Sequence, residues 1–153
     1  MKKYEFTGET KEIRLLFRTA TLHRIRATVA FGIVEVGDLG GWIEKEENLS
    51  HEGKAWVWGN AEVWGNAKVF SASHVLVIGA IGSRNDFTTF YRDKDNEITV
   101  KCGCFLGKID RFLEKVTQTH GDSKYALVYR AAVEVAKLQI DLSGEAPKDA
   151  DEE

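Results

Sequence analysis

Residues 55–78 divide into four hexads, AWVWGN, AEVWGN, AKVFSA and SHVLVI. A small residue opens each hexad, and a valine follows two positions later. Weaker copies precede them at Ile43 and Leu49, in phase with the small positions. The Gly-Asn pairs suit corners, because glycine adopts positive φ freely and asparagine tolerates it. A period of six is typical of a parallel β-helix, so we predict a short β-helix of about two coils over residues 39–80.

The flanking zones must cap this solenoid, because a stack of two coils cannot bury its own ends. Residues 1–38 alternate apolar and polar side chains, which predicts an N-terminal β region. Residues 81–104 predict a loop and a β-hairpin. Residues 105–142 switch to helical period and break at Gly121, which predicts an αα-hairpin. Residues 143–153 hold the single proline and a run of acids, so we expect a disordered acidic tail.

These zones together predict a mixed α+β fold that is mainly β. The second predicted helix should begin near Asp122 or Ser123, which are good capping residues. Its apolar positions predict one buried stripe made of Tyr125, Val128, Tyr129, Ala132, Val135, Ala136 and Leu138.

Composition excludes several classes of protein. The 153 residues carry 21 Lys+Arg and 24 Asp+Glu, and the net charge of −3 argues against a general nucleic-acid-binding protein. Two cysteines, Cys102 and Cys104, do not make a disulfide framework. No apolar run reaches membrane-spanning length, and the start of the chain lacks a signal-peptide core. We therefore expect a cytoplasmic protein with no membrane or nucleic-acid partner.

An ordered set of motifs runs through residues 20–140: Gly37-Asp38-Leu39-Gly40-Gly41-Trp42-Ile43-Glu44, Asn48-Leu49-Ser50, the tandem hexads, Ile81-Gly82-Ser83-Arg84-Asn85, Thr88-Thr89-Phe90, Cys102-Gly103-Cys104-Phe105 and Thr119-His120-Gly121. This set resembles uncharacterised small phage and prophage proteins with hexapeptide-like repeats of the left-handed β-helix type and a C-terminal helical hairpin. The resemblance implies a phage origin, the bacterial cytosol as location and a homo-oligomer, with a trimer favoured and a dimer as the alternative. It implies no particular chemistry.

The turn after Gly82 is the candidate ligand site. A glycine turn followed by a hydroxyl, a guanidinium and an amide can hold an anion, because backbone N–H groups and arginine both suit phosphate. Nearby threonines add donors, and an aromatic ring could stack on a base. The alternative is an ordinary polar loop in which Arg84 pairs with Asp86 or is solvated. The candidate residues are Ser83, Arg84, Asn85, Thr88, Thr89 and either Phe90 or Tyr91 as the stacking ring.

Two further surfaces follow from the strand pattern. Arg24 and Arg26 share one face of a predicted strand and form a secondary anion-binding candidate, unless Glu5, Glu9 and Glu12 balance their charge. If the repeat valines point inward, the residues after them point outward. We expect this aromatic surface to lie in an oligomer interface made of Trp56, Trp58, Trp64 and Phe70. The alternatives are that these rings pack under the helical hairpin or form a platform on which bases stack.

The remaining reactive side chains give no catalytic or metal assignment. Cys102 and Cys104 lack a second pair of ligands, so no metal or cofactor is expected. His74 lies on the predicted outer side of the last hexad and could act as a general base, as in hexapeptide-type acyltransferases. His120 could do so too, but a histidine at a helix end is most simply favoured by the helix dipole.

The favoured function is a non-catalytic binding protein that counteracts host immunity by sequestering an anionic, nucleotide-like messenger. The first alternative is a protein that blocks a bacterial defence enzyme with the helical hairpin and the acidic tail, in the manner of an anti-CRISPR protein. The second alternative is the acyltransferase, and the last is a structural or assembly protein with no ligand. The first two differ in whether deletion of residues 143–153 matters.

Overall fold

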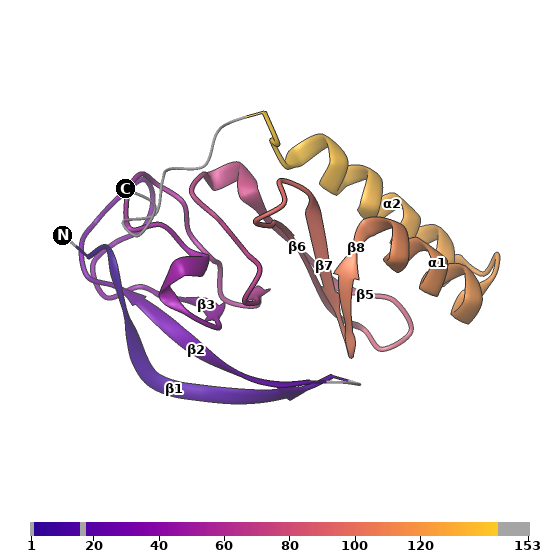
Figure 1. Cartoon of the computed structure of the whole chain (residues 1–153), viewed down its shortest axis with the longest axis horizontal. Coiled ribbons are helices and arrows are strands. Elements are labelled where there is room, and N and C mark those ends of the chain that lie inside the picture. Colours follow the sequence, from indigo (N-terminus) through magenta and orange to yellow (C-terminus); the bar gives the residue numbers. More distant parts are fainter. Residues whose placement is uncertain (1, 16–17, 144–153) are drawn as a thin grey trace.

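A computed structural model describes residues 2–15 and 18–143, and the fold is mixed α+β and mainly β (Figure 1). The first open sheet has the strand order β1 (Tyr4–Arg14), β2 (Thr19–Ala27), β3 (Leu39–Ile43) and β4 (Glu62–Val63). The second open sheet has the order β5 (Val75–Ile81), β6 (Asp86–Arg92), β7 (Ile98–Cys102) and β8 (Phe105–Lys108). Two helices follow, α1 (Ile109–His120) and α2 (Lys124–Gln139).

The second sheet separates two hydrophobic cores. Because successive strand residues point to opposite faces, Phe90 packs in one core with the helices, while Tyr91 packs in the other with the repeat and β2. Figure 1 shows α1 and α2 side by side on the outer face of this sheet and the first half of the chain on its other face. The predicted hairpin in residues 81–104 is present as β6 and β7.

The repeat is buried as predicted, but it is not a closed coil. The small residues and the valines of its first three hexads are all buried: Ala55, Val57, Ala61, Val63, Ala67 and Val69. Parallel pairing joins Ile43 to Val63 and Leu49 to Val69, so these two residues align with valine positions rather than with small ones. The fourth hexad is different, because Val75–Ile81 forms β5 and pairs antiparallel with β6.

A glycine pair brings β3 against the repeat. A Cβ built on Gly40 would lie 2.7 Å from the side chains of Ile25 and Trp56. A Cβ on Gly41 would overlap the carbonyl oxygen of Trp58 and lie 2.7 Å from that of Ala61. The Gly41 N–H donates to Val57 O at 2.7 Å, so the missing side chains allow a direct backbone contact.

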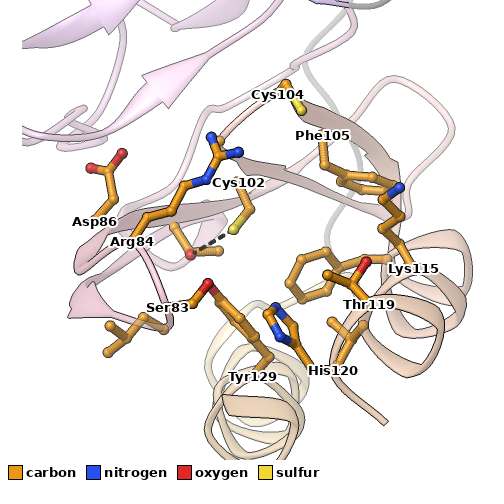
Figure 2. Close-up of a pocket in the computed structure, with 15 residues that line it drawn as sticks. Ser83, Arg84, Asp86, Cys102, Cys104, Phe105, Lys115, Thr119, His120 and Tyr129 are labelled. Atoms are coloured by element: carbon orange, nitrogen blue, oxygen red, sulfur yellow. Dashed lines mark hydrogen bonds between the residues drawn. The ribbon is translucent and has the colours of Figure 1, made fainter.

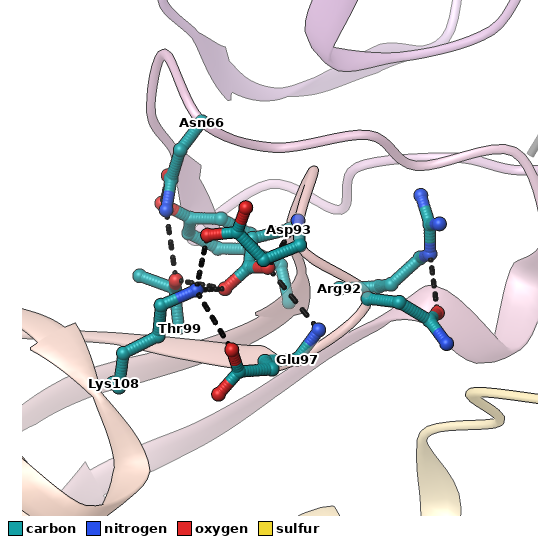
Figure 3. Close-up of polar contacts among 9 residues, drawn as sticks. Asn66, Arg92, Asp93, Glu97, Thr99 and Lys108 are labelled. Carbon is teal, nitrogen blue, oxygen red and sulfur yellow. Dashed lines mark hydrogen bonds and ion pairs between the residues drawn. The ribbon is translucent and has the colours of Figure 1, made fainter.

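A buried carboxylate joins the repeat to the second sheet (Figure 3). Asp93 is fully buried, and its Oδ2 accepts from Thr99 Oγ1 at 2.7 Å and pairs with Lys108 Nζ at 2.7 Å. Its Oδ1 accepts the backbone N–H groups of Asp95 and Glu97. Asn66 of the second hexad donates to Thr99 Oγ1 at 2.9 Å and accepts from the Tyr91 hydroxyl. This network thus joins the second hexad to β7, with Asn66 and Thr99 lying 33 residues apart in the sequence.

The helical hairpin forms as predicted, with two corrections. Gly121, at φ +56°, ends α1, and Ser123 precedes the first residue of α2. Phe105–Lys108 is a strand, β8, instead of the start of a helix. The predicted buried stripe of α2 is wrong at four positions, because Tyr125, Val128, Val135 and Leu138 are exposed. The buried residues are Ala126, Tyr129, Ala132, Val133 and Ala136, and the three alanines let the helix lie close to the sheet.

None of the described helices is long and apolar enough to cross a membrane.

Candidate functional site

A cavity of about 240 Å³ lies between one end of the second sheet and the two helices (Figure 2). The β5–β6 turn and the β7–β8 turn form one side, and α1 with the start of α2 forms the other. Fifteen residues line it: Ile81, Ser83, Arg84, Asp86, Thr88, Cys102, Gly103, Cys104, Phe105, Phe112, Lys115, Val116, Thr119, His120 and Tyr129. Because these residues come from separate strands, helices and turns, the site exists only in the folded chain.

Glycine at position 82 sets the shape of the turn that carries Ser83 and Arg84. Gly82 has φ +81°, and a Cβ there would overlap the Tyr129 hydroxyl. The Asn85 N–H donates to Gly82 O at 3.1 Å, and Asn85 takes φ +51°. Both positions therefore carry residue types that accept left-handed backbone, and the tight turn lies directly against α2.

Two cations face this cavity without a carboxylate partner. Within the part of the chain that the structure describes, neither Arg84 nor Lys115 forms an ion pair or a hydrogen bond. Arg84 does not pair with Asp86, whose Oδ1 accepts the Phe87 N–H at 2.7 Å. The Arg84 side chain is exposed, which agrees with the other form of that alternative, a solvated arginine. Figure 2 shows Arg84 on the turn side of the cavity and Lys115 on the α1 side, with the Phe105 ring between their charged ends in this view. Both side chains are exposed, and the positive charge of each can contribute to binding an anion at the cavity.

The inner wall combines aromatic rings with hydrogen-bonding groups. Phe105 and Phe112 lie with centroids 5.4 Å apart, and His120 stacks on Tyr129 at 5.7 Å. Burial, with the adjacent Cys102 thiol, raises the pKa of Tyr129 to about 12. The Tyr129 hydroxyl is therefore protonated at neutral pH and can donate to a bound acceptor.

The cysteines lie at the β7–β8 turn. Cys102 is half-buried and receives a hydrogen bond from Thr88 Oγ1 at 3.4 Å, and Cys104 is exposed. Both are free thiols. Across residues 2–15 and 18–143, no cluster of three or more histidine, cysteine or acidic side chains could hold a metal ion.

The structure brings together part of the predicted ligand site. Ser83, Arg84 and Thr88 line the cavity, whereas Asn85 shapes the turn without lining it. Thr89 points to the opposite face of β6, where its Oγ1 accepts the Glu62 N–H at 3.0 Å. Phe90 and Tyr91 are fully buried in the two cores, so neither can stack on a ligand. The aromatic rings at the cavity are Phe105 and Phe112 instead.

Sequence reasoning missed the helical side of the site except for His120, the second candidate base, which does line the cavity. Lys115 and Thr119 lie one turn apart on α1, and Tyr129 comes from the next helix. Their side chains look like ordinary helix residues in the sequence. Only the packing of the hairpin against β8 and β5 brings them opposite Arg84.

The two arginines of the predicted secondary anion-binding face are paired with glutamates. Arg24 pairs with Glu9 at 3.3 Å, and Arg26 pairs with Glu5 at 2.7 Å. The alternative in which glutamates balance these arginines therefore holds for both positions.

The aromatic oligomer interface is corrected at two positions. The expectation that Trp64 points outward is wrong, because Trp64 is fully buried, and Trp56 is buried as well. Arg18 lies over the Trp64 ring at 5.1 Å. Trp58 remains 47% exposed and Phe70 is half-buried, so only these two could contribute to a contact between copies.

His74 is buried rather than on an outer surface. Its Nδ1 accepts the Phe70 N–H at 3.2 Å, so it cannot serve as the accessible base of an acyltransferase. Burial and the nearby Arg92 guanidinium lower the pKa of His74, against a smaller opposing effect of Asp141. Burial also lowers the pKa of His51, whose Nδ1 accepts the Lys3 N–H.

These two histidines predict a loss of stability in mild acid. Below about pH 6.5 the unfolded chain binds protons that the folded His74 and His51 resist, so the free energy of unfolding should fall as pH falls. Urea unfolding between pH 7.5 and 5 measures the slope. His74→Gln keeps a hydrogen-bond acceptor and should give a shallower slope. An unchanged slope would contradict the assignment to His74.

Comparison with known proteins supplies no relative: no family model matches the chain, and no curated protein matches it either.

Proposed function

We propose that this chain is a non-catalytic binding protein of phage origin that sequesters an anionic, nucleotide-like messenger and so counteracts host immunity. The observation that carries the proposal is the pair of cations, Arg84 and Lys115, that face one cavity without a carboxylate partner among the described residues. Because arginine matches phosphate bidentately, Arg84 holds the phosphate and Lys115 adds charge from the other side.

The rest of the cavity suits the remainder of a nucleotide. Phe105 and Phe112 offer an apolar wall for a base, while Ser83, Thr88 and Tyr129 offer hydrogen bonds. At about 240 Å³ the cavity lies just below the usual size range of small-molecule sites, so part of a nucleotide would extend beyond it. Oligomerisation would bring a further surface to this open side.

The phage origin and the β-helix belong to the same proposal. The motif order supports the origin, through its resemblance to small phage proteins. The buried hexad positions and the parallel contacts of Ile43 and Leu49 support one open coil derived from a hexapeptide repeat, in place of the two coils expected from the sequence. The coil would be capped by β2 on one side and by the second sheet on the other.

Replacing Arg84 tests the proposal. Isothermal titration calorimetry with a panel of mononucleotides, linear dinucleotides and cyclic dinucleotides should find at least one that binds the native chain. Arg84→Ala should weaken that affinity more than tenfold, because the principal phosphate contact is lost. Arg26→Ala is the matched control, since it removes an equal charge from a site already paired with Glu5. Equal affinity of Arg84→Ala and the native chain would remove Arg84 from the site.

Native mass spectrometry tests the class of partner. Protein purified from bacteria with an active nucleotide-signalling defence should retain a mass of nucleotide size. No adduct, and no binding across the panel, would refute sequestration and favour the protein-blocking alternative. That alternative depends on the acidic tail, of which residues 144–153 lie outside the described residues; deleting residues 143–153 should then abolish activity against the host.

A further inference from the structure

The outward side of α2 carries an apolar stripe, which we call the α2 stripe. It consists of Leu127, Val128, Ala131, Val135 and Leu138, all exposed, with Leu138 at 89%. The buried residues of the same helix lie on the opposite side and pack in the second core. Figure 1 shows α2 at the outside of the molecule. A surface helix of a monomer normally has a polar outer face, so the α2 stripe calls for a covering partner.

The spacing of the α2 stripe indicates that the partner is another helix. Val128, Ala131, Val135 and Leu138 follow each other at intervals of three, four and three residues. This is the a and d spacing of a heptad, which keeps an apolar seam on one side of a helix. Ala131 lies near the middle, where a small side chain allows close approach of a second helix axis.

We propose that the α2 stripe is the contact surface for a second copy of this chain, with the two α2 helices antiparallel across a two-fold axis. An axis near the middle of the stripe pairs Val128 with Leu138 and Ala131 with Val135, each pair occurring twice. Leu138 then meets the smaller Val128, and Val135 meets the smaller Ala131, as in knobs-into-holes packing. The stripe is therefore complementary to itself.

The charges at the two ends of α2 favour the antiparallel arrangement. Lys124 begins the helix, and Asp141 lies two residues after its end; both are exposed. Antiparallel pairing sets Lys124 of each copy near Asp141 of the other. Parallel pairing would instead set like charges together at both ends. Asp141 also accepts hydrogen bonds from Ser143, which hold its carboxylate at this end of the helix.

The size of the α2 stripe sets the strength of the contact. Twelve residues from position 127 to 138 span about 18 Å of helix. A helix pair of this length buries less than the ~1,200 Å² typical of stable complexes, so we expect a weak dimer that forms only at high protein concentration.

Sedimentation equilibrium without ligand tests the assembly. Protein concentrations from about 1 to 500 µM cover the range in which such a small contact should form. The native chain should shift from monomer to dimer. Leu138→Glu and Val135→Lys should raise the dissociation constant more than tenfold, because each places a charge in the apolar seam. Gln118→Glu on α1 is the matched control for Leu138→Glu, because it adds the same charge to an exposed position outside the stripe. A native chain that stays monomeric, forms a trimer, or forms dimers that resist both substitutions would overturn the inference.

Charge reversal tests the antiparallel register. Lys124→Asp and Asp141→Lys should each weaken the dimer, and the double variant should restore it, because the opposite charges meet again. In a parallel dimer each single reversal only exchanges one like pair for another, so unchanged single variants would overturn the register.

The inference rests on the expectation of a homo-oligomer, but the dimer and the nucleotide site can be refuted independently of each other. Dimerisation is measured without nucleotide, and nucleotide affinity can be measured on the monomeric Leu138→Glu chain. If Arg84→Ala loses nucleotide binding while the native chain is a monomer, the proposed ligand site stands and only the proposed dimer is refuted.

Discussion

Gly41→Ala should destabilise the fold by about 3 kcal/mol or more, because the new Cβ has no space. It would overlap the Trp58 carbonyl oxygen, and the nearest further atom is another backbone oxygen, that of Ala61. Backbone atoms cannot rotate away as a side chain can. β3 would have to move from the repeat and lose the Gly41–Val57 hydrogen bond.

Gly59→Ala is the matched control for this substitution. Gly59 lies in the same repeat, has no positive φ, and a Cβ added to it would meet no other atom within 4 Å. Its unfolding free energy should stay within about 0.5 kcal/mol of the native value. Urea unfolding followed by tryptophan fluorescence measures both. Equal stabilities of the two variants would contradict the close approach at Gly41.

Removal of the buried carboxylate should have a comparable or larger effect. Asp93→Ala takes away the acceptor of two backbone N–H groups and the Thr99 hydroxyl, and it leaves Lys108 without its buried partner. A hydrogen bond to a charged group contributes about 1.5–3 kcal/mol, and Asp93 accepts three such bonds besides its pair with the half-exposed Lys108. We expect a loss of about 4 kcal/mol in urea unfolding, or no folded protein at 37 °C.

Asp95→Ala provides the comparison within the same network. Asp95 also pairs with Lys108, at 2.8 Å, but its side chain is exposed. Solvent screens that pair, so the variant should lose far less stability than Asp93→Ala. Asp93→Asn keeps the shape and one acceptor oxygen, and it should fall between the two. The same loss from Asp93→Ala and Asp95→Ala would mean that burial does not decide the strength of this network.

The sequence revealed the regular parts of the fold, because their periods are local. The valines at 57, 63 and 69 recur every six residues, and Gly121 stops a helix by its own backbone preference. The prediction that the fourth hexad continues the coil is wrong. Val75 keeps the repeat spacing, but its strand pairs with β6 in the second sheet. Spacing identifies an inward side chain but not the partner strand.

The site was predictable only on its turn side. Gly82 followed by Ser83 and Arg84 is a local signal for an anion-binding turn, and these residues do lie at the cavity, Ser83 and Arg84 in its lining and Gly82 directly before them. Lys115 and Tyr129 depend on how two helices pack on a sheet, which no local pattern encodes. The exposure of Val135 and Leu138 was hidden for a similar reason: α2 is apolar on two sides, and hydrophobicity alone does not tell which side meets the sheet.

The second sheet, with one core on each face, has a consequence for how the molecule comes apart. Neighbouring residues of β6, Phe90 and Tyr91, anchor opposite cores, so neither half can lose its packing while the strand keeps its place. All four tryptophans, at positions 42, 56, 58 and 64, lie in the first half, whereas the cavity lies in the second. Melting should therefore be a single cooperative event, and a nucleotide bound beside Arg84 should delay the fluorescence change of tryptophans that it never touches.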